Sequence, residues 1–538
     1  MLHHGPGDWG MTTNLTPPKC WVIIETGANQ RYIFGTNKRR ANIGASEIVH
    51  RVGASWTTDA LEQVQGVTPV VQASGKAILV AASQSAGQDF VEVVTARALR
   101  EAPGLGVWGV VHPVTSGGDF GLQDAHLALA LARANGTHPE LRFQAMPFSQ
   151  PCVFTGLPAA TVGAVGSDRD QPMSAPFASV FKVKGRDKQG PSTDGLERLT
   201  AIVCKGGQSV MSAVPTKLDA RAATGGTTNI ESGLDPVQNA GWVAIVHADG
   251  NGIGNLFLKI AEKCRDDEIL DTLGDFSGDL NDVTENAVAA AAVIAAQQYE
   301  QRYERMPEAW LLPVIVGGDD VTVILDGRMA LDFTEAFLRE FEKLARGKST
   351  IHEVNRAVNG DAAPPVTASA GIAYIKPHHP FSDGYDLAEQ LCSSAKDLTR
   401  VSGNASALDY HVLFDSVGRD VDAIRQSMVV KASDGSSRLR LWSGPVLLEG
   451  AANIVTLREA IQTFGKARDE VSSTAAHALR SALAIGGPTI EKTLSQRGLS
   501  RSARTLVEAD DDHLYPGGKR SWLIDSLALD EVARGVSR

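Results

Sequence analysis

The chain has 538 residues, which is more than one ordinary hydrophobic core accommodates, so we expect about two to four domains. Hydrophobic residues make up 43% of it and charged residues 21%, a composition typical of a globular protein in water. The formal net charge of −11 argues against a general coat for nucleic acid, although a local basic groove is compatible with it.

The cysteines and the apolar runs restrict the cellular setting. Five cysteines are scattered without a Cys-x-x-Cys pair, which argues against a zinc ribbon or a disulfide framework and favours a reducing compartment. The longest apolar run, residues 287–296, is too short and too rich in alanine to span a bilayer. Residues 1–19 contain no apolar signal segment, and we interpret them as a flexible leader. We therefore expect a cytoplasmic protein that binds neither zinc nor a membrane.

Residues 20–150 alternate between strand-like and helix-like patterns. Short runs rich in β-branched residues indicate strands, and apolar residues at helical spacing indicate helices. The predicted elements are a strand at 20–26, a helix at 43–52, strands at 67–72 and 77–82, a helix at 86–102, a strand at 105–114 and a helix at 121–135. The two central strands flank a tight turn, Ala73-Ser74-Gly75-Lys76, which contains no acidic residue.

Residues 237–415 show a similar alternation more clearly. The predicted elements are a strand at 242–249, helices at 255–267 and 282–307, strands at 313–316 and 321–325, a helix at 328–347, a strand at 366–375 and a helix at 386–401. This order of strands and helices is that of a split βαβ, ferredoxin-like unit. We predict an α+β fold with two such units, of which residues 20–150 are a diverged copy.

The two remaining regions differ from these units in composition. Residues 151–236 are rich in Gly, Ser, Thr and Pro, and we predict an irregular connecting region with exposed loops there. Residues 416–538 carry mostly helical patterns, which predicts a separate C-terminal α-helical domain.

Three aspartates are predicted to meet at one corner of the second unit. Asp249 ends its first strand, and Asp319 and Asp320 follow Gly317 and Gly318 in the turn between the next two strands. In the ferredoxin-like topology the first strand lies beside this hairpin. The end of the strand and the tip of the hairpin should therefore form one acidic site.

An acidic corner of this kind suits phosphoryl transfer with a divalent metal. Mg²⁺ is held by carboxylates and substrate phosphates. Two ions about 3.5–4 Å apart clamp the attacking and leaving oxygens of an in-line displacement. We therefore predict a two-metal site for Mg²⁺ or Mn²⁺ at Asp249, Asp319 and Asp320. Gly317 and Gly318 would let the backbone approach a triphosphate closely, because neither has a Cβ atom.

A purely structural role for these residues is the alternative. Gly-Asp is ordinary turn chemistry, and another Gly-Gly-Asp, at residues 117–119, precedes a predicted helix instead of forming a hairpin. The apolar strands on both sides of the second sequence, and Asp249 upstream, favour metal binding over a turn alone. Lys396 on the last predicted helix could contact the β- and γ-phosphates. A solvated surface lysine is an equally good interpretation of that residue.

Several motifs of this chain resemble a known family. The sequences ADGNGIG, LPVIVGGDDVTVIL, TASAGIAYIKPHHPF, AEQLCSSAK and LDYHVLF resemble the second palm domain of the large subunit of type III CRISPR effector complexes. Residues 29–53 look like the first palm domain of that family. The resemblance implies that the second palm makes cyclic oligoadenylate from ATP at its Gly-Gly-Asp-Asp hairpin. It also implies that the first palm binds a second nucleotide, which agrees with the missing acids at residues 73–76.

The resemblance assigns a role to most of the candidate residues. It implies that the catalytic residues and metal ligands are Asp249, Asp319 and Asp320. It implies that the nucleotide is contacted by Gly44, Ser46, Gly317 and Gly318, and we predict Gly250 and Lys396 as further nucleotide-binding residues. The chain departs from the family at Asn251, where many members have a second acid, and in lacking the cysteine-rich zinc module, since Cys152 stands alone. The partners implied are ATP or another NTP, and also RNA and smaller subunits of an effector complex.

Three functions are compatible with these observations. The first is a nucleotidyltransferase that makes a cyclic or linear oligonucleotide messenger and releases pyrophosphate, in CRISPR-type or related antiviral defence. The second is a cyclic dinucleotide or mononucleotide cyclase acting alone, because the hairpin also resembles that of GGDEF diguanylate cyclases and class III nucleotide cyclases. The third is a scaffold subunit that binds RNA without catalysis.

Overall fold

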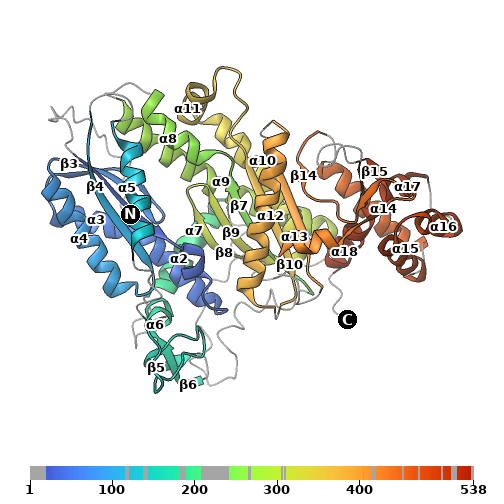
Figure 1. Cartoon of the computed structure of the whole chain (residues 1–538), viewed down its shortest axis with the longest axis horizontal. Helices are drawn as coiled ribbons and strands as arrows, with labels where there is room; N and C mark the ends of the chain where they lie inside the picture. The colour runs from blue at the N-terminus through green and yellow to red at the C-terminus, as the bar shows by residue number, and fades with distance from the viewer. Residues whose placement is uncertain are drawn as a thin grey trace.

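The computed structural model describes residues 20–115, 120–136, 143–165, 168–181, 190–207, 241–263, 268–303, 307, 310–377, 379–403, 405–414, 420–450, 453–470, 473–497, 501–510 and 518–534. Two α+β units and a mainly helical C-terminal unit follow one another along the long axis of the molecule (Figure 1). The predicted leader, the Gly-Gly-Asp sequence at 117–119 and residues 208–236 lie outside the described residues. None of the described helices is long and apolar enough to cross a bilayer.

The first unit is a four-stranded antiparallel sheet with helices packed on it. Its strands follow the order β2-β3-β1-β4, the ferredoxin-like order predicted from the sequence. The elements are β1 (Cys20–Gly27), α1 (Asn29–Ile33), α2 (Arg39–Gly53), α3 (Ser55–Gln63), β2 (Val67–Ala73), β3 (Lys76–Ala81), α4 (Gln84–Glu101), β4 (Gly106–Pro113) and α5 (Leu122–Asn135). Strand β1 is central, and its side chains from Cys20 to Ile24 are at most 5% exposed. Such a continuous apolar run is typical of a strand that is covered on both faces.

The second unit repeats this order and adds two strands at one edge. Its sheet has the order β14-β11-β10-β7-β9-β8, in which β10-β7-β9-β8 is the predicted antiparallel ferredoxin-like core. The strands are β7 (Val243–Gly250), β8 (Leu311–Gly317), β9 (Asp320–Asp326), β10 (Ala368–Ile375), β11 (Ala407–Val412) and β14 (Val446–Leu447). The helices are α8 (Ile253–Lys263), α9 (Ile269–Arg302), α10 (Gly327–Gly347), α11 (Ser349–Asn359) and α12 (Phe381–Val401). Strand β11 runs parallel to β10 and so extends the core sheet.

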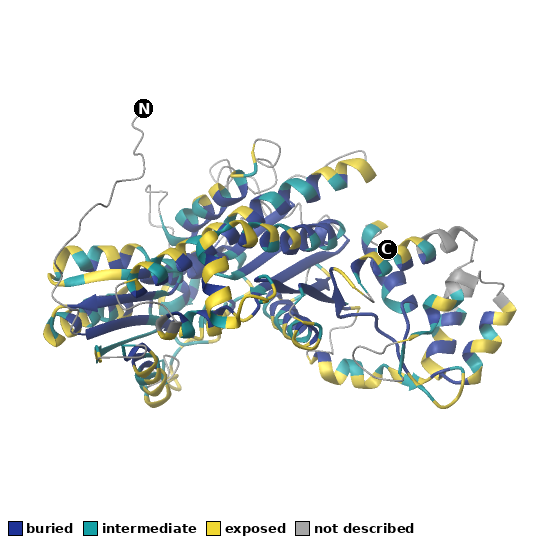
Figure 2. Ribbon diagram, turned by 90° about the horizontal axis from the view of Figure 1, so that it is seen from above, coloured by how far each residue is buried: buried dark blue, intermediate teal, exposed yellow. Residues whose placement is uncertain are grey.

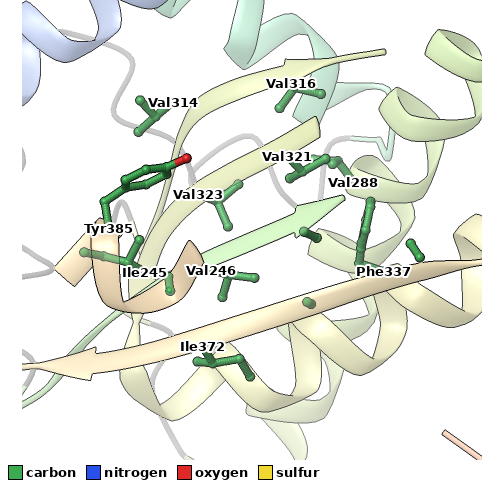
Figure 3. Packing of buried hydrophobic residues seen from close by; sticks show 14 of the residues in the cluster. Ile245, Val246, Val288, Val314, Val316, Val321, Val323, Phe337, Ile372 and Tyr385 are labelled. Atoms are coloured by element: carbon green, nitrogen blue, oxygen red, sulfur yellow. The ribbon is translucent and has the colours of Figure 1, made fainter. Parts of the chain in front are cut away.

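Helices cover both faces of the second sheet. A Cβ atom on Gly384 of α12 would lie 2.5 Å from Cδ1 of Ile245 in β7, so α12 packs closely on the face that Ile245 occupies. Figure 3 shows Tyr385 of α12 beside Ile245, and shows Phe337 of α10 near Val288 of α9. The last two side chains are at most 1% exposed. The resulting core holds β7 and the β8–β9 hairpin rigidly, and Figure 2 shows these strands buried between helices with exposed outer surfaces.

The prediction of an irregular connecting region is wrong for the part that the structure describes. This part contains β5 (Ala159–Val165), β6 (Asp168–Ser174), α6 (Ala175–Phe181) and α7 (Pro191–Cys204). A Cβ atom on Gly44 of α2 would lie 2.3 Å from the carbonyl oxygen of Val180 in α6, and one on Gly195 of α7 would lie 2.8 Å from Cβ of Glu47 in α2. Small residues therefore allow helices to approach closely here, whereas composition alone suggested loops.

The C-terminal unit is mainly helical, as predicted, but it also contains a small sheet. Its helices are α13 (Val421–Ser427), α14 (Ile454–Glu470), α15 (Ser473–Ile485), α16 (Pro488–Arg497), α17 (Arg501–Val507) and α18 (Leu523–Arg534). The sheet has the order β12-β13-β16-β15, formed by β12 (Val429–Lys431), β13 (Arg438–Arg440), β15 (Ala509–Asp510) and β16 (Lys519–Arg520). Strands of two or three residues are too short to show an alternating pattern, so the sequence did not reveal them.

A buried polar network joins the second unit to the C-terminal unit. Nη2 of Arg425 in α13 donates a hydrogen bond to Oδ2 of Asp409 in β11 over 2.7 Å, and its Nη1 donates to Oγ of Ser394 in α12 over 2.8 Å. Asp409 is fully buried. The backbone N–H of Ser443 donates to Oδ2 of Asp525 in α18 over 2.7 Å. The bonds of Arg425 cross from α12 and β11 to α13 and fix the junction between the two units, and the Ser443 bond ties the following segment to α18.

Candidate active site

Strand pairing brings the three predicted aspartates together. Strands β7 and β9 are antiparallel, with Ala248 opposite Val321, so Asp249 lies beside the tip of the β8–β9 hairpin. The side chains of Asp249 and Asp319 are within hydrogen-bonding contact. The convergence predicted from the topology is thus present in the structure, while the roles of these residues in metal binding remain a prediction.

Helix α9 holds the turn of this hairpin. Gly318 has a φ of +63°, a left-handed conformation that glycine adopts without a Cβ clash. Its N–H donates to Oδ1 of Asn281 over 3.2 Å, and its carbonyl oxygen accepts from Oγ1 of Thr284 over 2.5 Å. Nδ2 of Asn281 donates in turn to Oε1 of Glu285 over 3.0 Å. Sequence reasoning missed Asn281 and Thr284, because polar residues on a helix are usually solvated.

The acidic site concentrates negative charge in a poorly hydrated corner. Burial, followed by the charge of Asp249, raises the pKa of Asp319 well above its usual value. The same two causes raise the pKa of Asp320 to about 8. Although 40% of the Asp320 side chain remains accessible, its Oδ1 atom is buried and makes no hydrogen bond. A cation bound at this corner would reduce the repulsion between the carboxylates. It would also give the Oδ1 atom of Asp320 a partner.

Lys396 lies at the site but contacts a carboxylate. Its Nζ atom forms an ion pair with Oδ2 of Asp249, and the two side chains are 25% and 32% exposed. Burial acts to lower the pKa of Lys396, but the charge of Asp249, the hydrogen bond to it and the charge of Asp319 contribute to a larger opposite effect, so the pKa is raised. The interpretation of Lys396 as a freely solvated surface lysine is therefore wrong, because Asp249 on the neighbouring strand holds it.

Two further polar residues support the acidic strand. Nδ1 of His247 lies 3.1 Å from Oγ1 of Thr322 and 3.5 Å from Oδ1 of Asp320. Burial lowers the pKa of His247, which keeps its imidazole neutral at pH 7. The amide of Asn251 is also occupied, since its Nδ2 donates to Oγ1 of Thr367 over 2.9 Å. Asn251 therefore fastens the strand end to its neighbour and does not face the aspartates as a further ligand.

The donor set of the corner fits a hard cation such as Mg²⁺ or Mn²⁺. Within the described part of the chain, no three His, Cys, Asp or Glu side chains already converge as a formed metal site, and Asp249 is turned toward Lys396. The carboxylates of Asp249, Asp319 and Asp320 nevertheless supply only oxygen donors, which these ions prefer. The unpaired Oδ1 of Asp320 is one such donor.

A cavity of about 500 Å³ lies between the two units and is lined by residues from the tips of both hairpins. A Cβ atom on Gly317 would lie 3.2 Å from Cβ of Ser74, so the tips approach closely at one wall. The candidate residues that line the cavity are Ser46, Gly317, Gly318, Asp319 and Asp320. The candidates outside its lining are Gly44, Asp249, Gly250 and Lys396. Gly44 serves the close packing of α2 on α6, and the structure lends no support to its predicted contact with nucleotide.

The second unit resembles a known protein family, and the whole fold resembles solved structures. Residues 242–402 match the family described as Cas10/Cmr2, second palm domain. No curated protein matches the sequence significantly. A structure of a Csm1–Csm4 cassette in complex with pppApApA is similar with a TM-score of 0.54 and 14% identity, over 96% of this chain and 69% of that chain.

Two further cassette structures are similar over the same extent. A Csm1–Csm4 cassette in complex with AMPPNP has a TM-score of 0.54 and 13% identity, over 97% of this chain and 70% of that chain. One in complex with one ATP has a TM-score of 0.50 and 12% identity, with the same coverage. At these identities the structural likeness shows the fold. The family match concerns the second unit, residues 242–402, within that fold. Residues 242–402 therefore match a Cas10/Cmr2 second palm domain, and the chain as a whole is similar in fold to the Csm1–Csm4 cassette structures.

Proposed function

We propose that this chain is a metal-dependent nucleotidyltransferase that joins ATP into cyclic or linear oligoadenylates and releases pyrophosphate. The observation that carries the proposal is the crowding of Asp249, Asp319 and Asp320 beside a cavity of about 500 Å³ that both palm-type units line. A cavity of this size accommodates a nucleotide. The similar structures in complex with pppApApA, AMPPNP and one ATP support adenine nucleotides as ligands.

The three carboxylates would hold Mg²⁺ or Mn²⁺ at the corner. Such ions, when bound, neutralise the charge of the triphosphate and activate the attacking oxygen. Gly317 and Gly318 leave room for phosphates close to the backbone. Lys396 stands next to Asp249 and is close enough to the acidic corner to add a positive charge beside an arriving triphosphate. The apolar walls of the cavity limit access of water, which disfavours hydrolysis in place of transfer.

The proposed activity would take place in a complex with partner molecules. Because the similar structures are cassettes of Csm1 with Csm4, we propose that the chain works with smaller subunits of a type III CRISPR effector or a related defence system, and with RNA. We place it in the cytoplasm. The two palm-type units within one chain make an obligatory homodimer unnecessary, which disfavours a cyclase that assembles its site from two copies.

The proposal is tested by incubating the purified protein with each of the four NTPs and Mg²⁺ or Mn²⁺, and resolving the products by mass spectrometry. An Asp319→Ala/Asp320→Ala double variant serves as control. We expect adenine oligonucleotides and pyrophosphate from the wild type and neither from the variant. The assay is repeated with target RNA and cognate small subunits. Absence of product under both conditions would contradict the enzymatic function and favour a scaffold subunit.

Loss of the Thr284 hydroxyl is expected to slow product formation about tenfold, because the Gly318 carbonyl then lacks its partner and the acidic turn becomes mobile. The variant is Thr284→Val, which keeps the shape of the side chain. Thr284→Ser restores the hydroxyl and should recover most of the rate. The rate is measured as pyrophosphate release at saturating ATP. A Thr284→Val enzyme as fast as the wild type would show that α9 does not position the turn.

A further inference from the structure

A lysine of the first unit faces the cavity that holds the acidic corner. Lys76 begins β3, directly after the turn of the β2–β3 hairpin. This turn is fixed, since the N–H and Oγ1 of Thr26 donate to the carbonyl oxygen of Gly75 over 2.8 and 3.1 Å. Lys76 is the one lysine or arginine among the described residues that line the cavity. Asp319 and Asp320, from the hairpin of the other unit, line it as well.

His126 of α5 orients this lysine. Nδ1 of His126 lies 2.9 Å from the carbonyl oxygen of Leu122, which can only accept, so Nδ1 carries the proton. Burial, together with the charge of Lys76, lowers the pKa of His126, and the ring is therefore neutral at pH 7. Its Nε2 atom is then an acceptor, 3.3 Å from Nζ of Lys76. The ammonium group of Lys76 donates one of its three N–H groups to His126, and the other two N–H groups remain for a ligand.

The charge of Lys76 is not neutralised by a carboxylate of the described chain. Glu25 lies opposite Lys76 on β1 and also lines the cavity, but its ion pair is with Arg133 in α5, whose Nη1 atom is 3.3 Å from Oε1 of Glu25. No ion pair joins Lys76 to any carboxylate that the structure describes, whereas Lys348 at the end of α10 pairs with Asp279 over 2.8 Å. A half-buried ammonium group without a counter-ion is a site for an anionic ligand.

We propose that Lys76, positioned by His126, binds the phosphates of the acceptor nucleotide, which is the nucleotide that supplies the attacking oxygen. This inference rests on the proposed function and adds an orientation to it. The acidic corner would take phosphates together with a metal ion, whereas Lys76 would bind them directly, so the cavity offers two distinct sites for phosphates. An acceptor with its phosphates at Lys76 would direct its ribose toward Asp319 and Asp320. The apolar walls, which include Phe257 and Leu280, are available to its base.

The inference is tested by binding in a background without the acidic corner, so that it does not depend on turnover. In the Asp319→Ala/Asp320→Ala protein with EDTA present, the dissociation constants of ATP and adenosine are measured by calorimetry. ATP is expected to bind at least about tenfold more tightly than adenosine, because its phosphates contact a desolvated ammonium group. Adding Lys76→Met should remove this preference, and Lys76→Arg should retain it.

Two further variants separate a binding role from a general effect of charge. Lys348→Met removes an equal charge from a lysine that already has carboxylate partners outside the cavity, and it should leave the preference unchanged. His126→Leu should weaken the preference, and His126→Gln, which retains an acceptor, should restore part of it. An unchanged preference in Lys76→Met, or an equal loss in Lys348→Met, would overturn the inference. Either result is independent of whether the wild type makes oligonucleotides.

Discussion

The Asp320→Asn variant should lose oligonucleotide synthesis and yet unfold at a higher temperature than the wild type at alkaline pH. The loss of activity is expected to be about a thousandfold, because the carboxylate is a proposed metal ligand and a bound metal contributes several kcal/mol to transition-state stabilisation. The gain in stability follows from the environment of Asp320. Burial and the charge of Asp249 raise its pKa to about 8, so its ionised form opposes folding.

The sign of the pH dependence follows from this shift. A carboxyl group whose pKa is raised in the folded state makes its most favourable contribution to stability below about pH 4, and this contribution is lost as the pH rises through about 8. The amide introduced by Asp320→Asn carries no charge, so the difference in melting temperature between variant and wild type should grow over that range. Water reaches 40% of the Asp320 side chain and screens part of the effect.

Melting temperatures measured in EDTA between pH 4 and pH 9 provide the test, alongside rates of pyrophosphate release. Addition of Mn²⁺ should raise the melting temperature of the wild type at pH 8, since the metal binds only the folded state, and should have a smaller effect on Asp320→Asn. A variant that retains normal turnover would remove Asp320 from the metal site. A melting difference that is constant with pH would show that Asp320 titrates normally.

Asp409→Ala is expected to destabilise the junction between the second and the C-terminal units by about 3–5 kcal/mol, because removal of one partner from a buried ion pair leaves the other charge without compensation. Asp409 is fully buried, and Arg425 is 12% exposed. The backbone N–H of Tyr410 also donates to Oδ1 of Asp409 over 2.8 Å and would lose its acceptor. A Cβ atom on Gly444 would lie 2.2 Å from this oxygen, so glycine is required beside it.

The measurement is the free energy of unfolding in urea, with proteolysis of the opened C-terminal unit as readout. Asp361→Ala is the matched control, since it removes an aspartate from a largely exposed pair with Arg356 and should change stability by less than about 0.5 kcal/mol. The double variant Asp409→Ala/Arg425→Leu should be more stable than Asp409→Ala alone, because it leaves no buried charge unpaired. Equal stability of Asp409→Ala and the wild type would contradict a role for this pair at the junction.

The features that could be predicted from the sequence are those with a local pattern. The apolar runs of β1 and β7, the amphipathic α10 and the glycines of the hairpin turns all carry a period or a turn signal, and together they indicated both ferredoxin-like units. The meeting of Asp249 with Asp319 followed from that topology, because β7 and β9 are neighbours in it. The short strands β12 and β15 and the helix α6 lacked such a signal. Helix α7 has one, with Pro191 at its start and Leu196, Leu199 and Ile202 at helical spacing, but the Gly-, Ser- and Thr-rich composition of the region led to a prediction of loops.

The sequence by itself determined the two-unit α+β architecture and the three aspartates, since these depend on residue type and spacing along the chain. Tertiary structure alone decided which polar side chains serve the site. Thr284 holds the Gly318 carbonyl, Lys396 pairs with Asp249, and Lys76 meets His126 across 50 positions of sequence. A polar residue on a helix or a strand end has the same local pattern whether it is solvated or buried. Only the packing of the elements sets which group it contacts and how strongly water screens the contact.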